Sequence, residues 1–147
     1  MKRIAIINGP NLNLVGRREP EIYGTRPLDG YLQELAQSYA QQGVELTTFQ
    51  SNHEGAIIDE LQRVGFGEAD GIVLNAGALT HYSIAIADAI RAITTPVVEV
   101  HISDVSKREP YRQVSVIRDA CIGVVMGYGL DSYRRAVQLL LGEGSAQ

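Results

Sequence analysis

Three polar residues alternate along one apolar stretch of the chain and could form part of an acid–base site. Glu99, His101 and Ser103 stand two residues apart, and side chains in a β-strand repeat every two residues, so all three can point to one side. A carboxylate inside a strand covered on both faces is costly unless it is paired, and His101 is a partner within reach. A carboxylate that holds an imidazole orients it and stabilises its protonated form, which suits a general acid. A purely structural pair of Glu99 and His101 at a sheet end is the alternative, and the spacing leaves both open.

A second candidate lies in the segment 11–25 (NLNLVGRREPEIYGT), which is long for a connection between a strand and a helix. It holds Arg18 and Tyr23 between Gly16 and Gly24, as expected for a lid that closes over an anion. A free tyrosine has a pKa of about 10, but a cation within a few ångströms stabilises the phenolate, so Tyr23 could act as a base. Spacing alone favours the simpler alternative, a surface loop whose tyrosine packs on the rim.

Polar groups also follow three apolar segments, at the points where these segments end. They are Asn8 and Asn11 after the first segment, Asn75 and His81 after the second, and Arg108 and Arg112 after the third. Open parallel sheets bind ligands beyond the carboxyl ends of their strands, so we expect these groups to meet at one edge. His81 also follows a Gly-rich turn whose backbone N–H groups favour anions or hydroxyl oxygens, although a simple helix cap would also explain this residue.

These residues are positioned by a chain that alternates apolar, β-type segments with amphipathic segments of helical length. We expect strands over residues 3–8, 44–50, 71–75, 96–101 and 121–126. We expect helices over residues 29–42, 81–93 and 130–141 and a further helix after residue 52, the first capped by Asp29 and the further one by Asn52. Strands without strict polar alternation, separated by helices, indicate a doubly wound parallel sheet covered on both faces. The expected fold is α/β, a flavodoxin-like three-layer sandwich with a five-stranded parallel sheet, in which the polar segment 102–120 is something other than a simple crossover helix.

Length and composition limit the classes of protein that this sequence can encode. The chain has 147 residues, of which 45% are hydrophobic and 20% are charged, so we expect one domain over residues 1–147 and exclude collagen-like, disordered and coiled-coil proteins. The net charge of -4 argues against a nucleic-acid partner held by bulk charge. No apolar run reaches the ~18 residues of a membrane span and no signal-peptide pattern follows Met1, so we expect a cytoplasmic protein without a membrane partner.

Several common cofactor and catalytic motifs are absent from the sequence. It has no P-loop, complete GxGxxG motif, GxSxG elbow or HExxH motif. The histidines and acidic residues lack the spacing of a metal centre, and the single cysteine, Cys121, excludes a zinc site built on paired thiols. Only Lys2 and Lys107 are available for Schiff-base chemistry, and neither lies at the carboxyl end of an expected strand.

Four segments closely resemble the type II 3-dehydroquinate dehydratases. They are residues 7–23 (INGPNLNLVGRREPEIY), 50–54 (QSNHE), 75–81 (NAGALTH) and 99–112 (EVHISDVSKREPYR). The segments are long, ordered along the chain and specific, and the resemblance spans nearly all of it. Asp104 stands where this family commonly has Asn, and residues 113–114 where it commonly has His; neither departure removes a residue of the chemistry described next.

The resemblance implies a lyase that uses no metal and no cofactor. Type II dehydroquinases remove water from 3-dehydroquinate in an anti elimination through an enolate, giving 3-dehydroshikimate in the shikimate pathway of chorismate and aromatic amino acid biosynthesis. Carried over to this chain, the resemblance makes Tyr23 the base, as a tyrosinate favoured by Arg18. Asn11, with the Pro10 carbonyl and a water, steadies the enolate oxygen. His101 protonates the leaving hydroxyl, and Glu99 holds His101.

The resemblance also implies the groups that bind substrate and a homo-oligomeric assembly. The implied binding residues are Ile102 and Ser103 for the carboxylate, Asn75, His81 and Arg112 for the ring hydroxyls, and Arg108 for the carboxylate region or lid closure. Asp88 lies in a largely apolar helical segment and requires a cationic partner, which makes it a candidate subunit contact. The family is typically a dodecamer of four trimers, in which Asp88 would reach Arg112 of a neighbouring subunit.

Two other functions compete with this interpretation. A non-catalytic, flavodoxin-like module that binds a small anion or a nucleotide would need a phosphate loop, which the sequence lacks. A structural subunit that had lost the chemistry would have lost Tyr23, Asn11 or His101, and all three are present. The enzyme is therefore the interpretation that the sequence favours.

Overall fold

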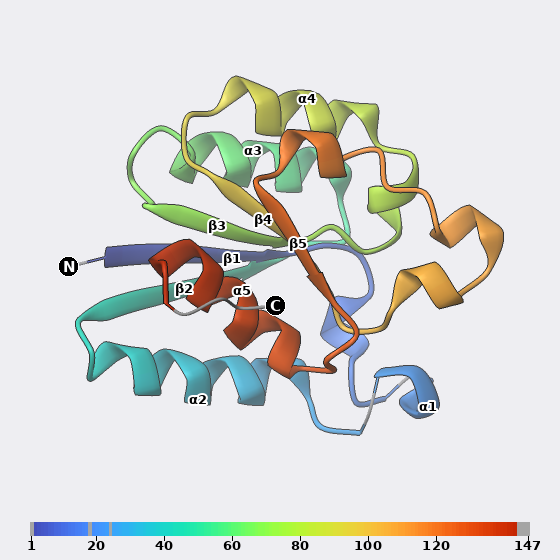
Figure 1. The fold of residues 1–147 in the computed structure, drawn as a ribbon, viewed down its shortest axis with the longest axis horizontal. Helices are drawn as coiled ribbons and strands as arrows, with labels where there is room; N and C mark the ends of the chain where they lie inside the picture. The colour runs from blue at the N-terminus through green and yellow to red at the C-terminus, as the bar shows by residue number, and fades with distance from the viewer. Residues whose placement is uncertain (1, 18, 24, 144–147) are drawn as a thin grey trace.

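The computed structural model describes residues 2–17, 19–23 and 25–143, which form a parallel sheet with helices on both faces (Figure 1). The five strands are β1 (Lys2–Asn8), β2 (Val44–Gln50), β3 (Gly71–Asn75), β4 (Val97–His101) and β5 (Gly123–Met126). They lie in the order β2-β1-β3-β4-β5, and every neighbouring pair is parallel. This is the flavodoxin-like order, so the predicted α/β three-layer sandwich is confirmed.

Two helices cover each face of the sheet (Figure 1). Helices α2 (Leu28–Ala40) and α5 (Asp131–Leu141) pack on one face, and α3 (Glu54–Val64) and α4 (Ile84–Ala92) pack on the other. Strand β1 shows why its sequence is apolar without alternation, since Ile4 and Ile6 enter one core and Ala5 and Ile7 the other. The short helix α1 (Pro20–Tyr23) and the first part of the segment between β4 and β5 lie beyond the carboxyl ends of the strands (Figure 1).

Three expected helix starts are wrong, and each correction has a local cause. Asp29 lies in the first turn of α2, after Pro27, and its carboxylate accepts from the N–H of Gly30 at 3.0 Å. Asn52 does not cap α3, because its side-chain oxygen is used by another part of the chain, described below.

His81 does not begin a helix either. It ends a 3-10 helix, η2 (Gly77–His81), and α4 begins only at Ile84. Ser83 is the cap, and its hydroxyl accepts from the N–H of Ile86 at 3.0 Å, as expected of a residue type that favours this position.

The connection from β4 to β5 contains no long helix, as its polar sequence predicted. It consists of three short 3-10 helices, η3 (Val105–Lys107), η4 (Pro110–Arg112) and η5 (Arg118–Ala120). Short turns of this kind let successive side chains face different directions. The same connection therefore faces the sheet edge with one part and the interior behind β4 with another.

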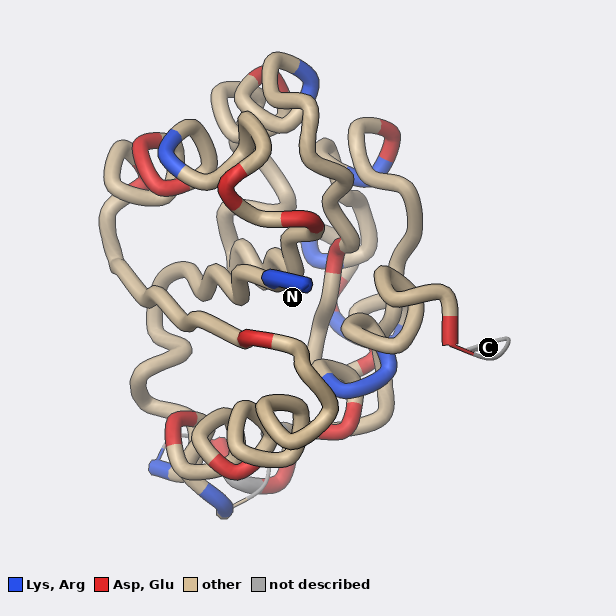
Figure 2. The backbone as a smooth tube through the Cα atoms, turned by 90° about the vertical axis from the view of Figure 1, so that its left-hand side faces the viewer, with Lys and Arg blue, Asp and Glu red and all other residues tan. Residues whose placement is uncertain are grey.

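Charged residues of both signs are spread over the helices and loops that surround the sheet (Figure 2). Along the part of the chain that is coloured in that view, Lys and Arg do not gather on one face. This distribution agrees with the small net charge of -4. Among the described helices, none combines the length and the apolar character that crossing a membrane requires.

Candidate active site

A cavity opens beyond the carboxyl ends of β1, β3 and β4. Eight of the residues singled out in the sequence line it: Asn11, Asn75, His81, His101, Ile102, Ser103, Arg108 and Arg112. Pro10 and Gly77, from the turns after β1 and β3, also contribute to the wall. The fold thus brings together residues from three strand ends, which is the edge where open parallel sheets bind ligands.

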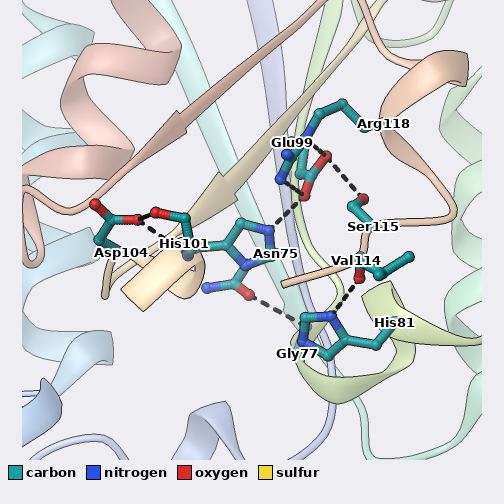
Figure 3. A network of polar contacts seen from close by, with 10 residues as sticks. Asn75, Gly77, His81, Glu99, His101, Asp104, Val114, Ser115 and Arg118 are labelled. Atoms are coloured by element: carbon teal, nitrogen blue, oxygen red, sulfur yellow. Dashed lines mark hydrogen bonds and ion pairs between the residues drawn. The ribbon is translucent and has the colours of Figure 1, made fainter. Parts of the chain in front are cut away.

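His101, on the wall of this cavity, forms a buried pair with Glu99, which lies behind it (Figure 3). Both side chains point to the α3/α4 side of β4, as their spacing predicts, and Nε2 of His101 lies 2.5 Å from Oε2 of Glu99. Since a carboxylate accepts, the ring donates through Nε2, and Nδ1 is the nitrogen that Glu99 does not engage. The pair can therefore orient a proton-bearing imidazole at the cavity wall.

Glu99 has further partners that sequence analysis missed (Figure 3). Arg118 donates from Nε to Oε1 at 3.1 Å and from Nη2 to Oε2 at 3.0 Å, and Ser115 donates to Oε1 at 3.2 Å. Complete burial of Glu99 acts to raise its pKa, but the hydrogen bonds from His101 and Arg118 outweigh burial and lower the pKa overall. A buried carboxylate signals that a cation must be near, but the sequence does not say which arginine supplies it.

The side chain of Asn75 is hydrogen-bonded to the phenol of Tyr133, which is fully buried. Its Nδ2 donates to the hydroxyl of Tyr133 at 2.9 Å, and that hydroxyl donates to Oδ1 of Asn8 at 2.6 Å. The N–H of Gly77 donates to Oδ1 of Asn75 at 3.2 Å. Sequence analysis did not find this role of Tyr133, because its partners lie 58 and 125 residues away along the chain.

His81 presents a hydrogen-bond acceptor to the cavity. Its Nδ1 lies 2.7 Å from the carbonyl oxygen of Val114, and because a carbonyl only accepts, Nδ1 carries the proton. Burial lowers the pKa of His81 below its ordinary value of 6.5, and the nearby charges of His101 and Arg112 lower it further. The ring is therefore neutral near pH 7, and Nε2 can accept a hydrogen bond from a hydroxyl group.

Asn11 is fixed by the segment that follows β2. Its backbone has a φ of 70°, in the left-handed region, and its N–H donates to Oδ1 of Asn52 at 3.0 Å. Gln50 supports the same turn, since its Nε2 donates to Gly9 O and to Asn52 Oδ1, each at 3.1 Å. The QSNHE segment thus has a role that sequence analysis did not assign, which is to hold the turn that carries Asn11.

Glycine is required where the turns after β1 and β3 touch. A Cβ atom on Gly9 would lie 2.6 Å from the carbonyl oxygen of Ala76, closer than real Cβ contacts. Gly77 has a φ of +61°, and a Cβ there would lie 3.0 Å from the carbonyl oxygen of Pro10. The close approach of the two turns sets the spacing between Asn11 and Asn75 across the cavity.

Two of the three arginines of the β4–β5 connection, Arg108 and Arg112, line the cavity. Arg108 is mostly buried, and its Nη1 lies 3.4 Å from Oγ of Ser103. Arg112 Nε lies 3.3 Å from a carboxylate oxygen of Glu109. This end of the cavity is therefore electropositive and suits an anionic group of a ligand.

The model of the family described as Dehydroquinase class II matches residues 2–141. The chain belongs to this family. The 3-dehydroquinate dehydratase of Chlorobaculum tepidum is 52% identical over 143 residues, which cover 97% of this chain and 95% of that protein. The 3-dehydroquinate dehydratase of an Exiguobacterium species is 54% identical over 139 residues, covering 95% of this chain and 94% of that protein. The crystal structure of the type II dehydroquinase from Butyrivibrio crossotus matches with a TM-score of 0.92 at 43% identity, over 95% of this chain and 97% of that one.

Besides Glu99, which lies behind His101, three residues that the likeness to class II dehydroquinases singles out are not among the described residues that line the cavity. Arg18 lies outside the described residues, as does the side chain of Tyr23, whose backbone ends α1. Asp88 is an exposed residue of α4 and is not among the described residues that line the cavity. The roles of these three residues remain predictions.

The described residues of this class II dehydroquinase contain no group of three or more His, Cys, Asp or Glu side chains that could hold a metal ion. The polar groups of the cavity are amides, imidazoles, a hydroxyl and guanidinium groups. Such groups bind carboxylates and hydroxyls and transfer protons.

Proposed function

We propose that this protein removes water from 3-dehydroquinate in an anti elimination through an enolate, giving 3-dehydroshikimate in the shikimate pathway. The observation that carries the proposal is that His101, on the wall of a cavity with one electropositive end, is paired with the buried Glu99. Elimination of a hydroxyl needs an acid at the leaving group, and a carboxylate substrate needs cations or N–H groups. Membership of the dehydroquinase family supports the same reaction.

Proton removal is assigned to Tyr23, with Arg18 stabilising its phenolate. A proton beside a ketone becomes acidic only when the developing enolate is stabilised. Asn11 and the carbonyl of Pro10, with a water between, serve that purpose, and both residues line the cavity. The left-handed backbone of Asn11, held by Asn52, supports this role because it fixes the turn from which the Asn11 side chain extends.

Proton donation is assigned to His101. Its Nδ1 gives a proton to the hydroxyl as the carbon–oxygen bond breaks, and its Nε2 stays on Glu99. The 2.5 Å contact between Nε2 and Oε2 supports this division of the two nitrogens.

Substrate binding is assigned to two sets of groups that line the cavity. The backbone N–H groups of Ile102 and Ser103, the Ser103 hydroxyl and Arg108 bind the carboxylate. Asn75, His81 and Arg112 bind the ring hydroxyls. The neutral His81 ring accepts from a hydroxyl through Nε2, and the Tyr133 hydroxyl holds the amide of Asn75 in one orientation.

Assembly and location complete the proposal. A homo-oligomer, a dodecamer of four trimers, would place the exposed Asp88 of one subunit near Arg112 of another. The exposed positions of Tyr82 and Ile84, at the start of α4, support a subunit contact on this face. The enzyme works in the cytoplasm without a metal or cofactor.

The reaction is tested by mixing the protein with 3-dehydroquinate in buffer without added metal or cofactor and following the ultraviolet absorbance of the conjugated enone. The wild type forms product, and Tyr23→Phe and His101→Ala each lose about 10²- to 10⁴-fold in kcat while remaining folded. Tyr128→Phe, at an exposed phenol after β5, keeps the wild-type rate and is the matched control.

Each contrary result has a distinct meaning. Undiminished turnover by Tyr23→Phe would remove the tyrosine from the role of base but keep the reaction. No product from a folded wild type would overturn the enzyme, and titration with nucleotides and small anions would then test the binding-module alternative.

A further inference from the structure

Arg118 lies behind the His101–Glu99 pair, and the proposed reaction assigns no role to it. Arg118 reaches Glu99 with two parallel hydrogen bonds, Nε to Oε1 at 3.1 Å and Nη2 to Oε2 at 3.0 Å. With His101 and Ser115 on the remaining lone pairs, the carboxylate accepts four hydrogen bonds. A fork-shaped pair of this kind fixes the plane of the carboxylate as well as its charge.

The position of Arg118 is set by the core beside it. The preceding residue, Ile117, is completely buried among the side chains of α3 and α4. The N–H of Ile122, shortly after η5, donates to the carbonyl of Val97 at 2.8 Å, which ties this turn to β4. The side chain of Arg118 is therefore positioned by the backbone of this turn, and it remains 36% exposed.

Proton transfer from His101 removes a positive charge beside Glu99, and Arg118 can supply the charge that remains. When His101 gives its Nδ1 proton to the leaving hydroxyl, the carbon–oxygen bond breaks, water leaves, and the imidazolium becomes a neutral ring. Glu99, which is fully buried, then loses the positive charge nearest to it, and a buried carboxylate without a cation takes up a proton. The charge of Arg118 persists through this step. The proton that the base removed from carbon balances the one that His101 supplied, and solvent exchange restores both groups.

We infer that Arg118 is a positioning residue for the general acid, holding Glu99 ionised and in one orientation while His101 gains and loses its proton. The inference rests on the proposed function for its place in the reaction. Other groups also face the pair. Arg112 on η4 and His81 on η2 approach from the cavity side, and Cys121 lies behind, where burial raises the pKa of its thiol to about 12 and keeps it uncharged. Within the described part of the chain, Arg118 is the arginine hydrogen-bonded to Glu99.

The test compares Arg118→Ala and Arg118→Lys with Arg63→Ala. Arg63 pairs with Glu60 and Glu68 on the surface of α3 and controls for the loss of an arginine ion pair. In Arg118→Ala we expect kcat to fall by about tenfold or more, within the contribution of a general acid, with KM little changed. Arg118→Lys retains the charge without the fork and recovers part of the rate.

Two measurements distinguish a role of Arg118 in positioning Glu99 from a role in stabilising the fold. Millimolar guanidinium chloride refills the partly exposed site and raises kcat of Arg118→Ala, whereas equal urea does not, and neither changes the wild type or Arg63→Ala. NMR titration of the His101 ring needs no turnover. Loss of a positive charge 3.0 Å from Glu99 means that the His101–Glu99 pair holds its proton to higher pH in Arg118→Ala.

The outcomes are distinct. Wild-type kcat in folded Arg118→Ala, or a loss of kcat with no guanidinium rescue and an unchanged His101 titration, would overturn the inference. If Arg118→Ala does not fold, Arg118→Gln carries the same comparison. If the wild type forms no product, the proposed function fails, and the NMR titration still decides whether Arg118 controls the pair.

Discussion

The hydroxyl of Tyr133 accepts a hydrogen bond from the side-chain amide of Asn75 at 2.9 Å, although 58 residues separate them in the chain. Tyr133 lies on α5, beneath the sheet, and Asn75 ends β3 at the cavity. A helix remote from the ligand therefore determines how one wall of the cavity presents its amide. Burial raises the pKa of this phenol, so it remains a neutral donor and acceptor.

Removing that hydroxyl tests the connection between α5 and the cavity. Tyr133→Phe leaves Asn8 and Asn75 with unpaired buried groups, so we expect unfolding to become easier by about 1–3 kcal/mol. The freed Asn75 amide rotates, so KM for 3-dehydroquinate rises more than kcat falls. Denaturant unfolding and steady-state kinetics measure the two effects. Tyr128→Phe, at an exposed phenol, is the control, and equal stability and KM in both variants would contradict the role of Tyr133.

A methyl group at Gly9 tests the contact between the turns after β1 and β3. The new Cβ would lie 2.6 Å from the carbonyl oxygen of Ala76, so the turns must separate. We expect Gly9→Ala to lose about 1–3 kcal/mol of stability and to lose most of kcat/KM, because Asn11 moves relative to Asn75.

The matched control for this change is Gly30→Ala on α2. A Cβ there meets nothing within 4 Å, and alanine is the better helix former, so we expect about 0.5–1 kcal/mol of added stability and wild-type activity. Thermal unfolding and kinetics of both variants check the pair of predictions, and an active, fully stable Gly9→Ala would show that the turns have room.

Acid should weaken the fold partly through Glu99. Burial alone would raise its pKa, but His101 and Arg118 lower it below the ordinary 4.5. The unfolded chain then binds the proton more readily, so the stabilisation is complete above pH 4.5 and is lost as pH falls through the lower folded value. Unfolding free energies measured across this window should fall more steeply for the wild type than for Glu99→Gln. Glu68→Gln, on the surface, should retain the wild-type slope; identical slopes for all three would contradict the prediction.

The fold was largely predictable because each strand carries its own signal. Strands β2 and β3 have the bounds expected from the sequence, since apolar residues run between clear breaks at Gly43 and Gly71. Helix starts were less predictable, because Asn52 is as good a cap as any polar residue but is used by Asn11 instead. The residue type alone does not show whether a side chain accepts from a distant N–H group or caps the helix next to it.

The residues that line the cavity were largely predictable, but the residues that hold them in place were not. Residues at the ends of parallel strands must meet, which places Asn75 and His101 at one cavity. Arg118 and Tyr133 act through contacts with residues 19 and 58 positions away. Their partners depend on the direction in which a short turn or a helix faces, and the residue types alone do not contain that information.

In the proposed reaction, the β4–β5 connection carries residues that bind substrate next to residues that support the general acid. Arg108 and Arg112 face the cavity, while Ser115 and Arg118 face the back of Glu99, and no long helix separates the two groups. An insertion or deletion between η4 and η5 would therefore disturb both at once. We therefore expect changes in the length of this stretch to alter substrate binding and acid catalysis together.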